Sequence, residues 1–416
     1  MAGCPDKAPF LCGNTTLSRG LCVQNEADCS TRSNTFRNIP KTPENALGKK
    51  YGYTDEPDLG RHCYFSQETL KVDYSATFDD GEEVPPTFSC LTYNIWGLAR
   101  KEESKQLFRL RKPLLEDTIR KTKADLLCLQ EMSEFSYREL EGLIHEYKFA
   151  SEVPYPQGTP VAGRNRSVDI YLLSKYKPSA LHVYGLPGVL GYENCLMVVE
   201  YKNLIVFNLY SQAGSVHSPG QTHKWIPYSR CRYDILQTIW GLIQSKYSEQ
   251  NVIICGDFNF HLDGSINEWP EMEMIDTFKA NGFIDTFRSV NPELPGFTED
   301  TDLNYMRWNQ KLIEKHYRYD GILFRGAWTP TSSEIIGTEY ECLNDKDSKW
   351  FIENMSEAKE KGLEHLVRCS KKRIPINPSD HFGVITSFSK AAGGRRIRKS
   401  TRRRREKSRK GRRRIF

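Results

Sequence analysis

Polar residues of the kinds that bind metal ions and transfer protons follow short apolar runs at four points in this chain. They are Asn94, then Glu131, then Asp257 with Asn259, and then Asp380 with His381, while Asp320 lies within a further apolar run. Mg²⁺ prefers oxygen ligands and binds through one or two carboxylates together with substrate phosphate, a need that Glu131 and Asn94 would meet. An imidazole beside a carboxylate is held charged or poised for proton transfer, which is the chemistry that His381 would supply.

The stretch 253–260, Ile-Ile-Cys-Gly-Asp-Phe-Asn-Phe, shows this pattern most clearly. Residues 252–255 predict a strand buried on both faces, and Gly256 would let the backbone turn as that strand ends. On an extended backbone Asp257 and Asn259 point to the same side, so an acid and an amide would be presented together. An Asx turn is the competing explanation, and this stretch alone favours it.

Each candidate residue also has an ordinary structural explanation when it is taken alone. Asn94 would then be a turn former and Glu131 a solvated helix cap. Asp320 would be a satisfied strand-end acid, and His381 a loop histidine. The recurrence of such strand ends along one chain is what favours a shared site.

The elements that must position these residues alternate between strands and helices. Strands are predicted at 88–96, 124–129, 167–174, 195–201, 204–210, 319–324 and 384–388, and amphipathic helices at 104–122, 136–147 and 229–247. Lys202-Asn203 between two apolar runs indicates a hairpin. Mixed sheets covered by helices follow from this order.

Four motifs carry a family resemblance. Thr92-Tyr93-Asn94, Leu129-Gln130-Glu131, Gly256-Asp257-Phe258-Asn259 and Ser379-Asp380-His381 resemble, in their usual order, those of the endonuclease/exonuclease/phosphatase superfamily. The resemblance covers roughly residues 87–389. It implies an α/β fold, a four-layer α/β sandwich of two mixed β-sheets packed face to face with helices outside. It also implies Mg²⁺-dependent hydrolysis of phosphodiester bonds, with Mn²⁺ as an alternative ion.

The same resemblance assigns roles to individual residues. Glu131 would be the main metal ligand, assisted by Asn94, and Asp380 would approach the metal. Asp257 would handle the attacking water or the leaving group, and Asn259 would hydrogen-bond a phosphoryl oxygen. His381, oriented by Asp320, would stabilise the charge that develops on phosphorus.

One position departs from the pattern of many family members. Tyr210 stands where a Thr-His-Leu motif usually places histidine, and Ser211 and Gln212 follow it. The abasic-site endonuclease branch is similar here, which implies that Tyr210 donates to a phosphoryl oxygen and that Gln212 binds the substrate backbone. A core tyrosine at a strand end is the competing explanation for Tyr210.

The branch within the superfamily stays open. Phe297-Thr298-Glu299-Asp300-Thr301 and Arg318-Tyr319-Asp320-Gly321-Ile322 are similar to the phosphodiesterases that remove tyrosyl adducts from DNA five-prime ends, and Arg318 is predicted to bind substrate. Asn94-Ile95-Trp96-Gly97 instead resembles neutral sphingomyelinases.

Charge is distributed unevenly along the chain. The net charge is +6 overall, but residues 390–416 hold 15 Lys or Arg and one acid, a net +14, which leaves −8 for the rest. Like-charge blocks of this kind are disordered interaction tails, and polyphosphate backbones are natural partners for them. A nuclear-localisation signal and an anionic membrane surface are the alternatives.

The 12 cysteines suggest two environments. Cys90, Cys128, Cys195, Cys231 and Cys255 lie in apolar segments and are predicted to be reduced core residues. Cys4, Cys12, Cys22 and Cys29 lack paired zinc-ligand spacing, and either two local disulfides or free thiols fit them. The expected domains are a Cys-rich module at 1–32, a linker or packed arm at 33–86, a catalytic domain at 87–389 and the Arg-rich tail at 390–416.

Together these features predict a metal-dependent phosphodiesterase. Nucleic acid is the expected substrate, DNA before RNA, contacted through the active-site cleft and the basic tail. A sphingomyelinase-like lipid phosphodiesterase and a catalytically weakened nucleic-acid-binding relative are the alternatives. Because no apolar run reaches membrane-spanning length and the N-terminus lacks a signal core, an intracellular monomer in cytoplasm or nucleus, or one associated with a virion, is expected.

Overall fold

The computed structural model describes residues 10–11, 22–23, 72–99, 101–151, 170–186, 195–214, 222–266, 268–310, 315–355, 369 and 373–390. The predicted Cys-rich module and Arg-rich tail lie almost wholly outside these residues. Their described part is a short antiparallel pair, β1 (Phe10–Leu11) with β2 (Cys22–Val23).

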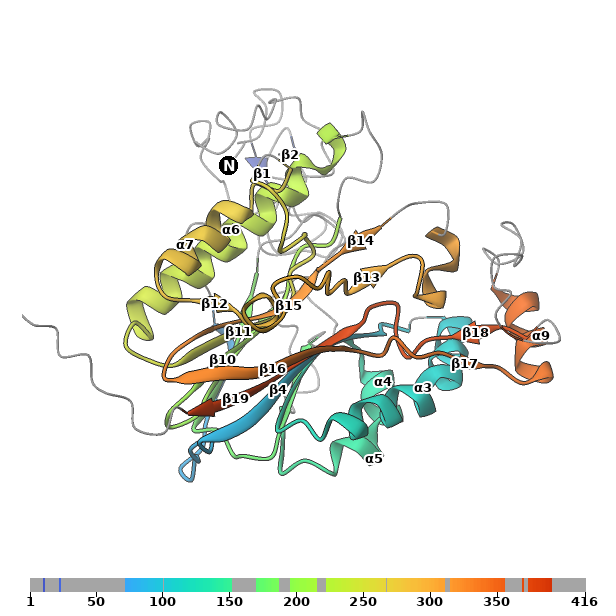
Figure 1. Cartoon of the computed structure of the whole chain (residues 1–416), viewed down its shortest axis with the longest axis horizontal. Helices are drawn as coiled ribbons and strands as arrows, with labels where there is room; N and C mark the ends of the chain where they lie inside the picture. Colours follow the sequence, from blue (N-terminus) through green and yellow to red (C-terminus); the bar gives the residue numbers. More distant parts are fainter. Residues whose placement is uncertain are drawn as a thin grey trace, which may run out of the picture.

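Two mixed sheets pack face to face at the centre of the molecule (Figure 1). The larger has the strand order β12 (Ile284–Asp285), β15 (Asp320–Arg325), β11 (Val252–Asp257), β10 (Ile205–Tyr210), β9 (Cys195–Glu200), β8 (Ala180–Gly185) and β3 (Val72–Thr77). The smaller has the order β16 (Trp328–Ile336), β19 (Gly383–Lys390), β4 (Thr87–Gly97), β5 (Leu126–Met132), β7 (Ile170–Ser174) and β6 (Phe149–Ala150). The β10–β11 and β4–β5 pairs are parallel, so the carboxyl ends of these strands lie together.

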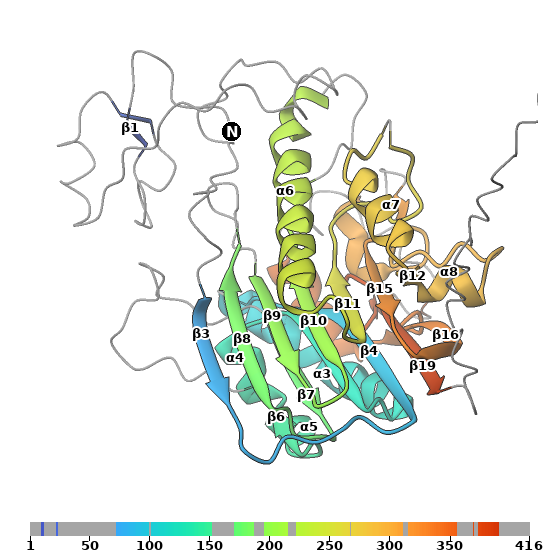
Figure 2. The ribbon, with the colours of Figure 1, turned by 90° about the vertical axis from the view of Figure 1, so that its left-hand side faces the viewer.

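Helices cover the outer face of each sheet. The larger sheet is covered by α6 (Thr222–Lys246) and α7 (Met272–Ala280), and Figure 2 shows α6 lying along its strands. The smaller sheet is covered by α3 (Glu102–Thr122), α4 (Glu134–Glu139) and α5 (Glu141–Ile144). The predicted four-layer α/β sandwich is therefore confirmed.

Successive side chains of each central strand point alternately into two hydrophobic cores, one under the helices and one between the sheets. In β11, Val252 and Ile254 pack under the helices, whereas Ile253 and Cys255 face the other sheet. Both faces of β11 are buried, as predicted from its continuous apolar run.

The remaining elements lie around the strand ends and edges. They are α8 (Thr286–Val290), the β13 (Glu299–Asp300) and β14 (His316–Tyr317) pair, η1 (Tyr305–Gln310), the β17 (Glu341–Cys342) and β18 (Pro375–Ile376) pair, and α9 (Asp345–Asn354).

Part of the expected linker or arm belongs to the sheet. β3 pairs antiparallel with β8 and forms an edge of the larger sheet. Farther along, the Pro86 carbonyl accepts hydrogen bonds from the Trp328 side chain and the Lys390 backbone. The packed domain thus begins before residue 87.

Three local predictions need correction. The helix predicted at 136–147 is two short helices, because α4 ends at Glu139 and α5 begins at Glu141. The strand containing Gly256 does not turn there but continues to Asp257. Cys231, predicted to be reduced, is disulfide-bonded.

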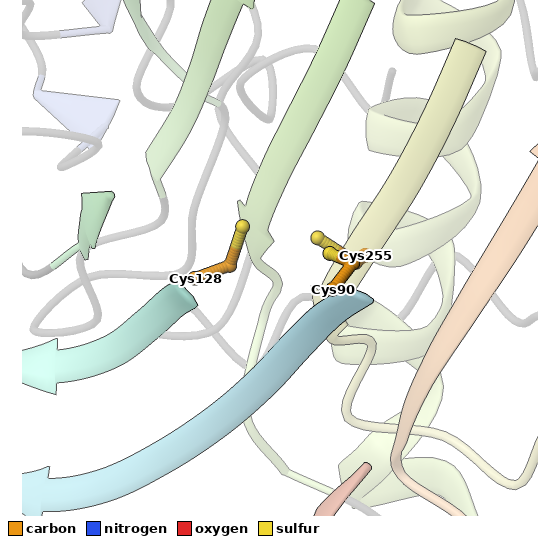
Figure 3. Close-up of side chains that lie close together, drawn as sticks. All are labelled: Cys90, Cys128 and Cys255. Carbon is orange, nitrogen blue, oxygen red and sulfur yellow. The ribbon is translucent and has the colours of Figure 1, made fainter. Parts of the chain in front are cut away.

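The other described cysteines are of two kinds. A second disulfide joins Cys342 to Cys369, whereas Cys90, Cys128 and Cys255 (Figure 3) are free and buried, as predicted. The side chain of Cys195 lies outside the described residues.

Gly256 is required by close packing of β11 against β10. Its φ is +144°, and a Cβ built on it would lie 1.9 Å from the Leu209 carbonyl oxygen. We expect Gly256→Ala to lower the free energy of unfolding by roughly 3 kcal/mol or more, because backbone strain and overpacking add. Chemical denaturation measures this loss. Gly241→Ala in α6 is the matched control, since nothing lies within 4 Å of its added Cβ. Equal stability of the two variants would contradict the assignment.

Candidate active site

Side chains from both sheets converge where the parallel strands end. Asn94 comes from β4, Glu131 from β5, Tyr210 from β10, Asp257 from β11 and Asp320 from β15, while Asp380 and His381 precede β19. Hydrogen bonds tie Asn94, Glu131, Tyr210 and Asp257 into one group. Ligand atoms of Asp257, Asp320 and His381 lie within 4.8 Å of one another. Residues separated by almost three hundred positions therefore share one site.

Glu131 is held by two neutral donors. Its Oε1 accepts hydrogen bonds from Asn94 Nδ2 at 3.1 Å and from the Tyr210 hydroxyl at 2.9 Å. Burial raises the pKa of Glu131, and the nearby Asp380 adds to this rise, while His381 and the two donors oppose it. Among the described residues no ion pair neutralises Glu131. A cation beside it would stabilise its charged form.

Asn94 is oriented as a donor rather than as a metal ligand. Its Nδ2 donates to both Glu131 and Asp257, the latter at 3.0 Å, and its Oδ1 accepts from the Trp96 backbone nitrogen. Fully buried, this amide holds two carboxylates in place. The predicted metal contact of Asn94 would need the side chain to turn, because its oxygen points away from Glu131.

Asp257 and Asn259 form the Asx turn that was the competing explanation. The Asn259 backbone nitrogen donates to Asp257 Oδ1 at 2.9 Å, and Asn259 Nδ2 donates to the Ser211 carbonyl. The backbone is not extended here, because Asn259 has a φ of +58°. Burial, reinforced by Asp320, raises the pKa of Asp257 to about 8. A carboxyl that titrates near neutral pH suits proton transfer.

His381 is paired with Asp320 inside the site. Its Nδ1 lies 2.8 Å from Asp320 Oδ2, and both side chains are almost fully buried. Burial alone would lower the pKa of His381, but Asp320 and Asp257 outweigh burial and raise it to about 10. A cationic imidazole with Nδ1 engaged leaves Nε2 to face the rest of the site.

Asp380 has a partner that the sequence did not indicate. Arg307 from η1 lies 3.3 Å from Asp380 Oδ2, donates to the Asp380 carbonyl at 3.0 Å, and also pairs with Glu299. Lys315 pairs with Glu299 at 3.1 Å. These two cations offset two acids next to Glu131 and His381, which limits repulsion among the carboxylates of the site.

Arg111 is a second residue that sequence reasoning missed. Its buried guanidinium, from α3, donates to the carbonyls of Ile95, Trp96 and Pro378. It thereby fastens the end of β4 to the loop that carries Asp380 and His381. The helical pattern predicted a buried face for α3, but gave no signal that this arginine turns inward.

The two predicted substrate-binding residues lie differently. Gln212 is buried, and its side-chain Nε2 donates to the Ala213 carbonyl. The backbone carbonyl of Gln212 accepts a hydrogen bond from Arg232, whose Nε lies 2.6 Å from Glu271. Arg318 is buried away from solvent and is bound by Asp263 and Asp285. Because both carboxylates already bind its guanidinium, the geometry gives no support for substrate binding by Arg318.

Three site residues have left-handed backbones. Trp96, Glu131 and Asn259 have φ values of +49°, +55° and +58°. Trp96 and Glu131 are the next-to-last residues of β4 and β5, and Asn259 follows β11. Non-glycine residues in this region are uncommon and concentrate at functional sites. Here the bend at Glu131 and Asn259 leaves both residues half-buried, while Asn94 and Asp257 are fully buried. Solvent therefore reaches the site past Glu131 and Asn259.

A profile of the Endonuclease/Exonuclease/phosphatase family matches residues 91–381, which contain all of these side chains. The chain belongs to this family. Members are hydrolases that act on phosphodiester bonds. No curated protein matches the sequence.

Several solved structures are similar to the chain over about three quarters of its length. SmcL is 14% identical with a TM-score of 0.50, covering 74% of this chain and all (100%) of its own. Beta toxin from Staphylococcus aureus is 15% identical with a TM-score of 0.49, over 73% of this chain and 100% of its own. Truncated TDP2 from Caenorhabditis elegans is 15% identical with a TM-score of 0.47, over 73% and 97%. At 14% identity the likeness to SmcL extends to the fold alone.

A buried polar bridge joins the two sheets directly beneath the site of this family member. Gln130 Nε2 from β5 donates to Asn208 Oδ1 of β10 at 2.7 Å, and Asn208 Nδ2 donates to the Tyr171 carbonyl. Both side chains are fully buried. Because each precedes a site residue by one or two positions, the bridge fixes the relative placement of Glu131 and Tyr210.

Tyr210 provides a test of how Glu131 is positioned. If Glu131 binds Mg²⁺ as the family resemblance implies, we expect Tyr210→Phe to weaken Mg²⁺ activation about 10-fold, because loss of a hydrogen bond to a metal ligand typically costs about 10–100-fold in affinity or activity. The Mg²⁺ dependence of phosphodiester hydrolysis measures this. Tyr184→Phe is the matched control, since among the described residues its buried hydroxyl has no hydrogen-bond partner. An unchanged Mg²⁺ dependence in Tyr210→Phe would contradict this role.

Proposed function

We propose that this chain is a Mg²⁺-dependent phosphodiesterase and that nucleic acid, DNA in particular, is its substrate. The single observation that carries the proposal is that Glu131, Asp257 and the His381–Asp320 pair lie together where the strands end. Glu131 is partly exposed to solvent there. This set combines a cation site, a proton acceptor and a positive donor, which are the three needs of metal-assisted phosphate hydrolysis.

The donor chemistry fits a hard divalent cation. Glu131 and Asp380 offer carboxylate oxygens, which Mg²⁺ and Mn²⁺ prefer. Glu131 also carries a pKa raised by burial and lacks an ion-pair partner in the described part of the chain. When bound, the cation would polarise the phosphoryl oxygens of the substrate.

The residues of the chain supply the remaining steps. Asp257 accepts the proton of the attacking water, since its pKa lies near neutral pH. His381 donates from Nε2 to a phosphoryl oxygen and stabilises the negative charge that develops there, with Asp320 keeping the imidazole cationic and oriented. Asn259, whose backbone is fixed by the Asx turn, donates one amide hydrogen to the Ser211 carbonyl, and we assign the second amide hydrogen to the same phosphate.

Nucleic acid is proposed from the charge of the chain. The segment 390–416 carries a net +14, and basic segments bind polyphosphate backbones with salt-sensitive affinity.

None of the described helices could span a membrane. The Cys342–Cys369 disulfide favours an oxidising setting such as a virion or cell surface over a reducing cytoplasm. A monomer remains our proposal.

One substrate panel tests the proposal. Full-length protein with Mg²⁺ would be given abasic duplex, tyrosyl-ended DNA, plasmid DNA and sphingomyelin vesicles, with His381→Ala as the inactive control. Hydrolysis of one or more DNA substrates is expected. Turnover of vesicles alone would replace the nucleic-acid proposal by the lipid one. DNA retention that salt abolishes, without any cleavage, would show a binding protein that has lost turnover.

A further inference from the structure

The loop that carries Asp380 and His381 is held by long polar side chains from elsewhere in the chain. Three successive backbone carbonyls of this loop each accept a hydrogen bond from such a side chain. The pairs are Pro378 with Arg111 at 2.5 Å, Ser379 with Asn304 at 3.0 Å and Asp380 with Arg307 at 3.0 Å. The loop connects β18 to β19, so these contacts, rather than a strand ladder, satisfy and fix its backbone.

Arg307 contacts this loop at two points. Its Nε donates to the Asp380 carbonyl, and its Nη1 lies 3.3 Å from the Asp380 carboxylate. Because a guanidinium is planar and presents its donors in a fixed fork, these two contacts hold the backbone and the side chain of Asp380 in one orientation. His381 is the next residue, and its imidazole must reach both Asp320 and the phosphate. The orientation of Asp380 therefore sets the position of His381.

Arg307 is itself held in place. Glu299, whose side chain is only 2% exposed, lies 3.5 Å from Arg307 Nε and is also paired with Lys315 at 3.1 Å. Tyr305 and Met306, the two residues before Arg307, belong to a hydrophobic cluster that includes side chains of α9 and β18. The guanidinium and the backbone that carries it are thus both anchored, which suits a residue that holds another group in place.

We propose that Arg307 is a positioning residue that holds Asp380 and His381 in the orientation that phosphodiester hydrolysis requires. This inference rests on the proposed function. Contact with the substrate is the competing role for an arginine at this place. Positioning is favoured because the Arg307 side chain is only 14% exposed and its Nε and Nη1 already face Asp380 and Glu299.

The two roles differ in kinetics. Loss of a substrate contact that acts equally in the ground and transition states raises KM, whereas misplacement of a catalytic group lowers kcat. Arg307→Gln is expected to lower kcat for a nitrophenyl phosphodiester about 10²-fold, the cost of a displacement of about 1 Å, and to leave KM nearly unchanged. Arg307→Lys should lose about 10-fold, because its ammonium keeps the charge but not the fork.

Arg288→Gln is the matched control for these variants. Arg288 also binds a carboxylate, that of Asp263, and also donates to loop carbonyls, those of Asn291 and Leu294. Its loop carries none of the site residues, so kcat and KM of Arg288→Gln should equal those of wild type. If Arg307→Gln fails to fold, Arg307→Lys is used in the same measurements.

Amide hydrogen exchange in metal-free protein gives a second measurement, which needs no turnover. The Phe382 nitrogen donates to the Thr298 carbonyl at 2.8 Å, and the His381 nitrogen donates to Ser379 Oγ at 3.4 Å. Because exchange reports local opening, Arg307→Gln should speed exchange at these two amides about 10-fold or more, relative to wild type and Arg288→Gln.

Three results would overturn the proposal. One is a raised KM with kcat unchanged, which would make Arg307 a substrate contact. Another is full kcat in Arg307→Lys, which would show that charge alone is needed. The third is unchanged exchange at His381 and Phe382 in Arg307→Gln. If wild type hydrolyses no phosphodiester, the proposed function fails, and the exchange measurement still decides whether Arg307 holds the loop.

Discussion

Replacement of Glu131 by glutamine is expected to reduce phosphodiester turnover by about 10³-fold or more. Glutamine preserves the size of the side chain and can still accept hydrogen bonds from Asn94 and Tyr210. What it removes is the negative charge that would hold the cation. Initial rates of hydrolysis of a nitrophenyl phosphodiester, measured over a range of Mg²⁺ concentrations, report the loss.

The same substitution should leave the fold intact or make it more stable. Burial raises the pKa of Glu131, which means that its charge is unfavourable in the metal-free protein, and removing a strained functional charge commonly raises stability. Mg²⁺ is expected to raise the thermal unfolding temperature of wild type but not of Glu131→Gln. Glu134→Gln is the matched control, because Glu134 is exposed at the start of α4 and pairs only with Arg138 in the described structure. More than a tenth of wild-type activity in Glu131→Gln would exclude Glu131 as the main ligand.

The convergence of the site could be predicted from sequence because it depends on strand order and period. Apolar runs ending in Asn94, Glu131 and Asp257 predicted strands, and strands that run parallel bring their carboxyl ends together. Family resemblance supplied the pairing of Asp320 with His381, which pattern alone would not give. The buried faces of β11 also followed directly from its composition.

What could not be predicted depends on local backbone geometry and on long side chains. The orientation of the Asn94 amide is set by a hydrogen bond from the Trp96 backbone nitrogen. The left-handed backbone conformation of Trp96 has no signature in the sequence. Arg111 and Arg307 reach the site from a helix and from a short 3-10 turn. Arginine in such elements is usually exposed to solvent. The sequence therefore predicts exposed side chains for both residues, not the buried positions that they have.

The same limit explains Gln212 and Arg318. A polar residue after a strand can face substrate or hold its own loop. The Gln212 side chain donates to the neighbouring Ala213 carbonyl, and Arg232, paired with Glu271, donates to the Gln212 backbone carbonyl. Likewise, the carboxylates that bind Arg318 lie 55 and 33 positions away in the sequence. Pairings at such separation become visible only once the fold is known.

Asp320→Asn is expected to shift the alkaline limb of the pH–rate profile to lower pH. In wild type, Asp320 and Asp257 raise the pKa of His381 to about 10 against the opposing effect of burial. Asparagine keeps the shape of the side chain but removes most of this attraction, so burial would dominate and His381 would be neutral at neutral pH. Turnover near pH 7 should fall by about 10²–10⁴-fold, the typical contribution of a positioned side chain that donates or accepts a proton.

The pair also predicts a pH-dependent stability difference. Because the folded pKa of His381 lies above its ordinary value of 6.5, the charged pair stabilises the native state fully below about pH 6.5, and this contribution is lost as pH rises toward 10. Denaturation of wild type and Asp320→Asn across this range should therefore show wild type losing its advantage with rising pH. Asp302→Asn is the matched control, since Asp302 contacts the more exposed His316 at 3.1 Å. If the alkaline limb stays in place in Asp320→Asn, then His381 is not the cation that stabilises the phosphate, and a cation such as Arg307, which lies beside Asp380, would have to supply that charge.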